Sequence, residues 1–145
     1  MFVADTNLLV YAVNRTAAGH AQARELVEAW RAGDEPWFLT WSIIYEFLQV
    51  TTWRRLHRQI LSVADARMFV TALLASPTIG LLMETPRHAA ILGELLDQQP
   101  GLSGGLMHDL HIVALMKEHG VSEIRTADVD FHRFSFLRVV NPLVG

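Results

Sequence analysis

The sequence contains no cysteine among its 145 residues. Disulfide bonds, thiolate zinc sites and thiol nucleophiles are therefore excluded. An excess of positive charge is also missing, because 12 Lys and Arg stand against 15 Asp and Glu, which gives a net charge of -3. Proteins that hold nucleic acid by bulk electrostatics are usually basic. A nucleic-acid substrate would therefore have to be held here by metal ions or by a short basic patch.

Long apolar segments and a targeting leader are missing as well. The longest uncharged stretch, residues 68–83, is interrupted by Ser76, Pro77 and Gly80, and it is shorter than the roughly 20 apolar residues that a membrane span needs. The N-terminus has no basic segment and reaches Asp5 almost at once, so it predicts no secretory signal. We therefore expect a soluble, cytoplasmic protein that does not associate with a membrane.

The composition is that of a chain with a substantial core. Hydrophobic residues make up 51% of the sequence and charged residues 19%, which is typical of well-buried globular proteins. A chain of this length can bury one hydrophobic core but not two independent ones. We predict a single domain over residues 1–145.

Short apolar segments alternate with helical ones along the chain. The predicted strands are residues 2–4, 37–39, 79–83, 123–126 and 137–140. Helices are expected to begin near Leu8, His20, Ser42, Ser62, Thr85 and Leu106, and a helical turn is expected at residues 131–134. The helix from Ser42 is expected to end near Arg55. Strands separated by helices predict an α/β fold with a central parallel sheet of about four to five short strands flanked by helices.

Two aspartates follow predicted strands directly. Asp5 comes after residues 2–4, and Asp128 comes shortly after residues 123–126. In parallel sheets the functional crevice lies beyond the carboxyl ends of the strands, so both side chains are expected at that edge. Each aspartate taken alone could instead be a helix cap.

Two further acids, Glu46 and Asp109, stand among apolar residues at helical spacing. A buried carboxylate is costly unless it is neutralised, paired or bound to a metal. Each of the two taken alone could form an internal salt bridge. A divalent cation would satisfy several carboxylates together, and an all-oxygen site suits Mg²⁺ or Mn²⁺.

An ordered set of short segments carries a resemblance to a known family. The segments are Val3 to Asn7 (VADTN), Trp41 to Phe47 (WSIIYEF), Asp109 in an apolar helix, Thr126 to Phe131 (TADVDF) and Val140 to Leu143 (VNPL). Together they resemble the PIN-domain ribonucleases and, within them, the VapC-type toxins of toxin–antitoxin pairs. The resemblance covers nearly the whole chain.

The resemblance implies a PIN-like fold and an endoribonuclease that depends on Mg²⁺ or Mn²⁺ and hydrolyses RNA phosphodiester bonds. The implied catalytic acids are Asp5, Glu46, Asp109 and Asp128, the implied metal ligands are Asp5, Asp109 and Asp128, and the supporting residues are Asn7, Thr126 and Asp130. It also implies a homodimer and a cognate antitoxin whose tail occupies the acidic site.

The sequence around Asp109 departs from the family pattern, because His108 and His111 flank this acid. In the family this helix tends to be rich in small apolar residues. The two histidines either are surface or outer groups of the site, or they tune the choice of metal toward a softer ion.

The densest basic segment is residues 53–58, which contains Arg54, Arg55 and Arg58 beside Trp53. These arginines either contact RNA phosphates, with the indole available for stacking, or form a solvated helix end.

Three other functions are compatible with parts of the sequence. A phosphatase or hydrolase could use a strand-end aspartate as nucleophile, but Asn7 stands two residues after Asp5, where one such family has a second aspartate. The pair His108-Asp109 suggests a histidine–aspartate metal phosphohydrolase, although the other histidines form no matching set. A non-catalytic interaction module could keep the acids for structure alone.

Overall fold

The computed structural model describes residues 1–54 and 58–144. Its strands are β1 (Phe2–Ala4), β2 (Trp37–Leu39), β3 (Ile79–Leu81), β4 (Glu123–Arg125) and β5 (Arg138–Val140). Its α-helices are α1 (Thr6–Val13), α2 (His20–Ala32), α3 (Trp41–Thr52), α4 (Val63–Leu74), α5 (His88–Gln98) and α6 (Leu106–His119). The expected helical turn is the 3₁₀ helix η2 (Val129–Arg133).

The five strands form one parallel sheet in the order β3-β2-β1-β4-β5. The α/β fold with a central parallel sheet is therefore confirmed. The chain moves outward from β1 through β2 to β3 and then crosses back to add β4 and β5 on the other side of β1. Such a reversal opens a crevice at the carboxyl ends of the two strands that flank it. The crevice of this sheet therefore lies beyond the ends of β1 and β4.

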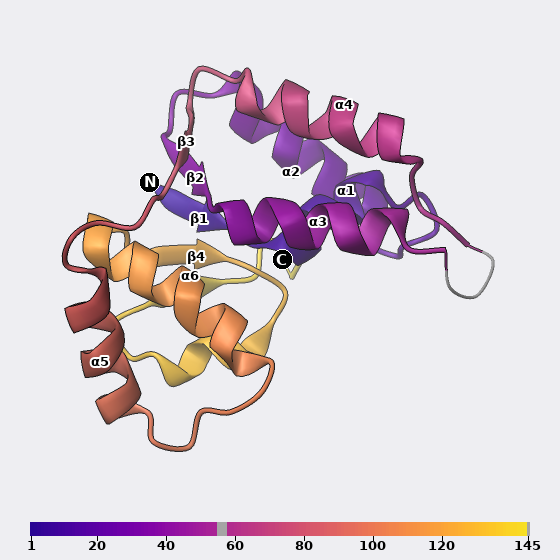
Figure 1. Ribbon diagram of the computed structural model, residues 1–145. Coiled ribbons are helices and arrows are strands. Elements are labelled where there is room, and N and C mark those ends of the chain that lie inside the picture. Colours follow the sequence, from indigo (N-terminus) through magenta and orange to yellow (C-terminus); the bar gives the residue numbers. More distant parts are fainter. Residues whose placement is uncertain (55–57, 145) are drawn as a thin grey trace.

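The sheet lies between two groups of helices. Figure 1 shows α1 to α4 in the upper part of the molecule and α5 and α6 in the lower part. The central strands β1 and β2 are apolar, and Phe2, Trp37 and Ile124 have no exposed surface, as expected for a parallel sheet with helices on both faces. Among the described residues, none of the helices is both long enough and apolar enough to cross a bilayer.

The end of α3 differs from the prediction. The helix stops at Thr52 rather than near Arg55, and Trp53 has extended backbone angles. The chain returns at this point, because the backbone amide of Leu61 donates a hydrogen bond of 2.8 Å to the carbonyl oxygen of Thr51. This hydrogen bond holds the returning segment against the end of α3, and helical periodicity does not report such a tertiary contact.

The start of α5 also differs, since the helix begins at His88 rather than at Thr85. The backbone amide and the hydroxyl of Thr85 both donate to the carboxylate of Glu118, at 2.9 and 2.7 Å. His88 Nδ1 lies 2.6 Å from the other oxygen of the same carboxylate. Glu118 on α6 therefore fixes the turn that precedes α5.

Candidate active site

The four predicted acids converge at the carboxyl edge of the sheet. Asp5 follows β1 and Asp128 lies just beyond β4, while Glu46 and Asp109 come from the neighbouring helices α3 and α6. All four line one cleft of about 210 Å³. Its other lining residues are Thr6, Asn7, Val10, Tyr11 and Val50, so no Lys or Arg of the described chain contributes to it.

Asp5 is the most firmly held of these acids. It is 6% exposed and caps α1, because its Oδ1 accepts a 2.8 Å hydrogen bond from the backbone amide of Thr6. Its Oδ2 accepts from the hydroxyl of Thr126 at 2.7 Å and from the amide group of Asn7 at 3.1 Å. Burial raises the pKa of Asp5 to about 6, although these hydrogen bonds oppose the shift.

Asn7 and Thr126 join the ends of the two central strands. The Asn7 side chain donates to the Thr126 hydroxyl at 3.0 Å and accepts from the backbone amide of Ala127 at 3.1 Å. The Thr126 hydroxyl also accepts from the backbone amide of Asp128 at 2.9 Å. Both supporting residues therefore fix the position of the loop that carries Asp128 relative to Asp5.

Asp128 caps a helix as well, since its Oδ1 accepts a 2.8 Å hydrogen bond from the backbone amide of Asp130 at the start of η2. The capping alternative is thus correct for Asp5 and for Asp128. Capping does not remove either side chain from the cleft, because a carboxylate has four lone-pair positions.

The expectation that Glu46 is buried on an apolar helix face is wrong. Its neighbours Ile43 and Phe47 are buried, but Glu46 itself is exposed at the border of that face. Its Oε2 accepts a 2.9 Å hydrogen bond from the Thr6 hydroxyl. The alternative of an internal salt bridge also fails for Glu46 and Asp109, because neither forms an ion pair with a described residue.

Three of the carboxylates are close enough to share one cation. Asp109, Asp128 and Asp130 each offer an oxygen, and these oxygens lie within 4.8 Å of one another. Burial, together with the negative charges of Asp5 and Asp128, raises the pKa of Asp109 to about 7. Oxygen ligands, converging negative charge and the lack of a basic partner all fit Mg²⁺ or Mn²⁺. Asp130, expected only as a supporting residue, lies within this group, whereas Asp5 does not.

Comparisons with known proteins agree with this arrangement. A family model described as the PIN domain matches residues 2–137. The chain belongs to the PIN-domain family. The similar curated proteins include Ribonuclease VapC33 of Mycobacterium tuberculosis, 34% identical over 143 residues and 99% of both chains. Another is Ribonuclease VapC48 of the same species, 29% identical over 141 residues and 97% of both chains.

Solved structures share the fold of this PIN domain. One is VapBC2 from Rickettsia felis bound to a DNA fragment from its promoter, with a TM-score of 0.65, 17% identity and 97% of both chains covered. Another is Mycobacterium tuberculosis VapC20, described as a toxin that cleaves the sarcin-ricin loop. It has a TM-score of 0.67 and 18% identity, with 97% of this chain and 100% of that chain covered.

The two histidines beside Asp109 do not join the acidic group of the PIN domain. His111 Nε2 lies 2.7 Å from the carboxylate of Glu84, and its ring meets that of His88 edge to face at 5.8 Å. His108 is exposed and lines a neighbouring cavity of about 530 Å³ that also includes Tyr45 and the acid Glu46. This placement favours the interpretation of both histidines as outer groups.

The basic segment of the PIN domain is only partly described. Arg54 is exposed beyond the end of α3, Arg55 lies outside the described residues, and Arg58 is exposed and lines a separate cavity of about 750 Å³. The same cavity contains Arg15, which no sequence motif predicts to be functional. Arg15 follows the end of α1 as a single basic residue, so only the folded chain brings it near Arg58.

Proposed function

We propose that this PIN domain, spanning residues 1–145, is a divalent-metal-dependent endoribonuclease and the toxin of a type II toxin–antitoxin pair. The observation that carries the proposal is the convergence of Asp5, Glu46, Asp109 and Asp128 in one cleft that contains no basic side chain of the described chain. The relatives named VapC ribonucleases support it.

The ligands of the metal come from two elements of the fold. Asp128 and Asp130 extend from the loop and η2 after β4, and Asp109 faces them from the first turn of α6. Asp5 lies beneath them, fixed by Thr126 and Asn7. Asp109, Asp128 and Asp130 would hold Mg²⁺ or Mn²⁺, which would supply Lewis-acid stabilisation of the phosphodiester and a more acidic water molecule.

Glu46 has a different role from the other three acids. It is the exposed member of the quartet and is oriented by the hydroxyl of Thr6. Its carboxylate lies outside the group of three carboxylates whose oxygens are close enough to share a cation. Glu46 is therefore the acid that accepts the proton of the attacking water.

The acidic cleft also suits an inhibitory partner. A guanidinium or ammonium group can pair with crowded carboxylates in place of a metal ion, so a basic residue in the tail of a cognate antitoxin would close the site. We further infer a homodimer in the cytoplasm. The exposed side chains of Trp41 and Tyr45, one turn apart on α3, offer apolar surface for such an interface.

The proposal is tested with the Asp109→Asn variant. We expect it to lose more than about 100-fold of Mg²⁺- or Mn²⁺-dependent RNA cleavage, because a ligand contributes at least as much as the residues that orient it. Its melting temperature should not fall, since the substitution removes repulsion. Asp97→Asn, the same change at an exposed position on α5, should cleave like the wild type. Cleavage by Asp109→Asn at the wild-type rate, or wild-type cleavage that resists EDTA, would contradict the proposal.

A further inference from the structure

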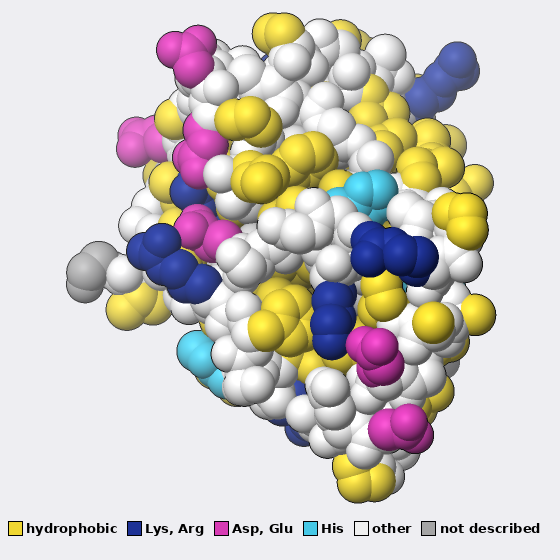
Figure 2. Space-filling model, turned by 90° about the vertical axis from the view of Figure 1, so that its left-hand side faces the viewer, with side chains coloured by type: hydrophobic (Ala, Val, Ile, Leu, Met, Phe, Trp, Pro, Cys, Tyr) yellow, Lys and Arg dark blue, Asp and Glu magenta, His cyan; other side chains and the backbone are white. Residues whose placement is uncertain are grey.

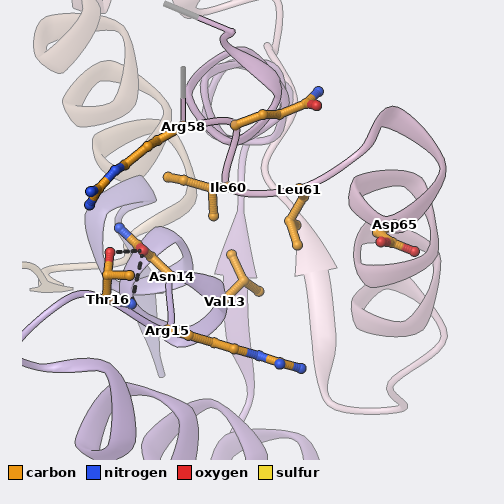
Figure 3. Close-up of a pocket in the computed structure, with 9 residues that line it drawn as sticks. Val13, Asn14, Arg15, Thr16, Arg58, Ile60, Leu61 and Asp65 are labelled. Carbon is orange, nitrogen blue, oxygen red and sulfur yellow. Dashed lines mark hydrogen bonds between the residues drawn. The ribbon is translucent and has the colours of Figure 1, made fainter. Parts of the chain in front are cut away.

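A cavity separate from the acidic cleft contains two arginines. It has a volume of about 750 Å³ and lies between the end of α1 and the segment that leads into α4 (Figure 3). Its lining includes the two arginines Arg15 and Arg58 and the partly buried side chains of Val13, Ile60 and Leu61, which pack against the core. The cavity thus combines positive charge with an apolar floor, and its volume is within the usual range for small-ligand pockets.

Hydrogen bonds fix both walls of the cavity. On one side, Oδ1 of Asn14 accepts from the backbone amide and the hydroxyl of Thr16, at 3.3 and 2.9 Å, which sets the backbone on either side of Arg15. On the other side, the bond from Leu61 to the carbonyl oxygen of Thr51 holds the second wall against the end of α3. The cavity therefore exists before any ligand binds.

The two guanidinium groups have no partner among the described residues. Neither Arg15 nor Arg58 forms an ion pair or hydrogen bond there, and both are exposed. The one acid in the lining, Asp65, lies on α4. Figure 3 shows Arg58 extending over Asn14, on the side of the cavity away from Asp65. The cavity carries a net positive charge in a chain whose net charge is -3.

Helix α1 connects this cavity to the acidic cleft. Val10 and Tyr11 line the cleft, whereas Val13 and Asn14 line the cavity. From Asn7 to Val13 the helix rises by about 9 Å at 1.5 Å per residue. A nucleic-acid strand whose phosphodiester lies at the acids reaches the cavity within a few nucleotides.

We propose that the Arg15–Arg58 cavity binds a nucleotide of single-stranded RNA that flanks the phosphodiester held at the acidic cleft. The inference rests on the proposed ribonuclease function and assigns a substrate subsite to it. The Arg15 and Arg58 side chains extend toward opposite sides of the cavity (Figure 3), so each guanidinium group binds a separate phosphate of the strand, and the base between them lies against Val13, Ile60 and Leu61. A base can enter a cavity only when it is unstacked, so the site selects a single strand or a loop over a continuous duplex.

The test measures RNA binding in the Asp109→Asn background, where the strand is not cut. The probe is a fluorescein-labelled, mixed-sequence single-stranded oligoribonucleotide in Mg²⁺, followed by anisotropy over a range of salt concentrations. Arg15→Gln and Arg58→Gln should each weaken binding by about tenfold. Each should also reduce the slope of log K against log salt by about 0.7. Arg58→Lys should keep the salt slope, because it keeps the charge.

The control is Arg24→Gln, which removes an exposed arginine on α2 that has no ion pair with a described residue and lines neither the cleft nor the cavity. It should bind RNA with the affinity and salt slope of its Asp109→Asn parent. All variants should keep the melting temperature of that parent, since the substituted side chains are exposed.

The inference is overturned if Arg15→Gln and Arg58→Gln leave the RNA affinity and the salt slope unchanged. If, in that case, the same variants reduce the binding of a poly-glutamate peptide, the cavity belongs to an acidic protein partner. Cleavage of the same oligoribonucleotide by the wild type is measured in parallel. If Asp109→Asn does not reduce that cleavage, the proposed ribonuclease function fails. If the wild type cleaves the RNA and Asp109→Asn does not, but the arginine variants bind RNA as their parent does, only the role of the cavity is rejected.

Discussion

Carboxylates at the two edges of the sheet are neutralised in different ways. At the amino edge, Glu35 pairs with the N-terminal amino group and with Arg125, both at 3.2 Å. Glu123 pairs with Arg125 at 2.9 Å and with Arg138 at 3.1 Å. The N-terminus lies on this side of the molecule (Figure 1), where basic and acidic side chains are interspersed (Figure 2). At the carboxyl edge, the cleft gathers four acids and no base of the described chain.

The pKa values follow this difference. Desolvation acts to raise the pKa of Glu35, but the hydrogen bond from the N-terminal amino group and the charge of Arg125 lower it overall. At the other edge, burial and neighbouring acids raise the pKa of Asp5 to about 6 and that of Asp109 to about 7. Acids of the first kind are neutralised within the chain. Acids of the second kind have no basic partner in the cleft among the described residues, a difference that the net charge of the chain does not show.

The largest effect should come from supplying the cleft with a cation. We expect Mn²⁺ at about 100 times its dissociation constant to stabilise the native state by about 2.7 kcal/mol, measured as a rise in melting temperature. Asp128→Asn should abolish most of the rise, whereas Glu123→Gln at the amino edge should keep it. An equal rise in both variants would mean that Mn²⁺ does not discriminate between the two edges.

The next effect should come from removing the internal cation. Arg125→Gln leaves Glu35 and Glu123 without a shared partner and removes a guanidinium group that lies 3.5 Å from the centre of the Phe2 ring. We expect the free energy of unfolding in urea to fall by about 1–2 kcal/mol, because the pairs are partly exposed. RNA cleavage at a temperature where the variant is folded should be unchanged. A loss of cleavage there would show that the two edges are coupled.

The smallest effect should be a dependence on pH. A raised pKa means that the folded state holds the proton more tightly than the unfolded chain, so the contribution of Asp109 to stability falls as pH rises from about 4 to about 7. We therefore measure, without metal, the melting temperature of Asp109→Asn minus that of the wild type at each pH. This difference should increase by a few degrees as the pH rises from about 4 to about 7. Saturating Mn²⁺ should remove the trend for the wild type, because the ion replaces the protons. A constant difference between the two proteins would contradict the raised pKa.

Much of the fold could be predicted from local sequence patterns. The apolar run of β1 and the stop of α6 at Gly120, which has a φ of 68°, are properties of a few adjacent residues. The ends of α3 and α5 were not predictable in this way. They depend on contacts of Thr51 with Leu61 and of Thr85 with Glu118, and the second pair is 33 residues apart in the sequence.

The site shows the same division. The aspartates after β1 and β4 could be located from strand ends, since parallel strands bring their carboxyl ends to one edge. Helical spacing predicted correctly that Asp109 lies partly buried on an apolar helix face. It predicted the same for Glu46, which is exposed, because periodicity does not distinguish the centre of an apolar face from its border. Arg15 has no motif at all. Arg15 and Arg58 line the same cavity only because the segment after α3 turns back toward the end of α1.

The position of β1 in the sheet has a consequence for how the protein is made. A ribosome releases β1 first and β4, which pairs with it, only after more than a hundred further residues. Until then, one edge of the central strand has no partner, and Asp5 lacks the hydroxyl of Thr126 that holds it. The acidic cleft therefore does not form on a nascent chain while β2, β3 and their helices fold. The complete site therefore does not exist until β4 and the loop that carries Asp128 have left the ribosome.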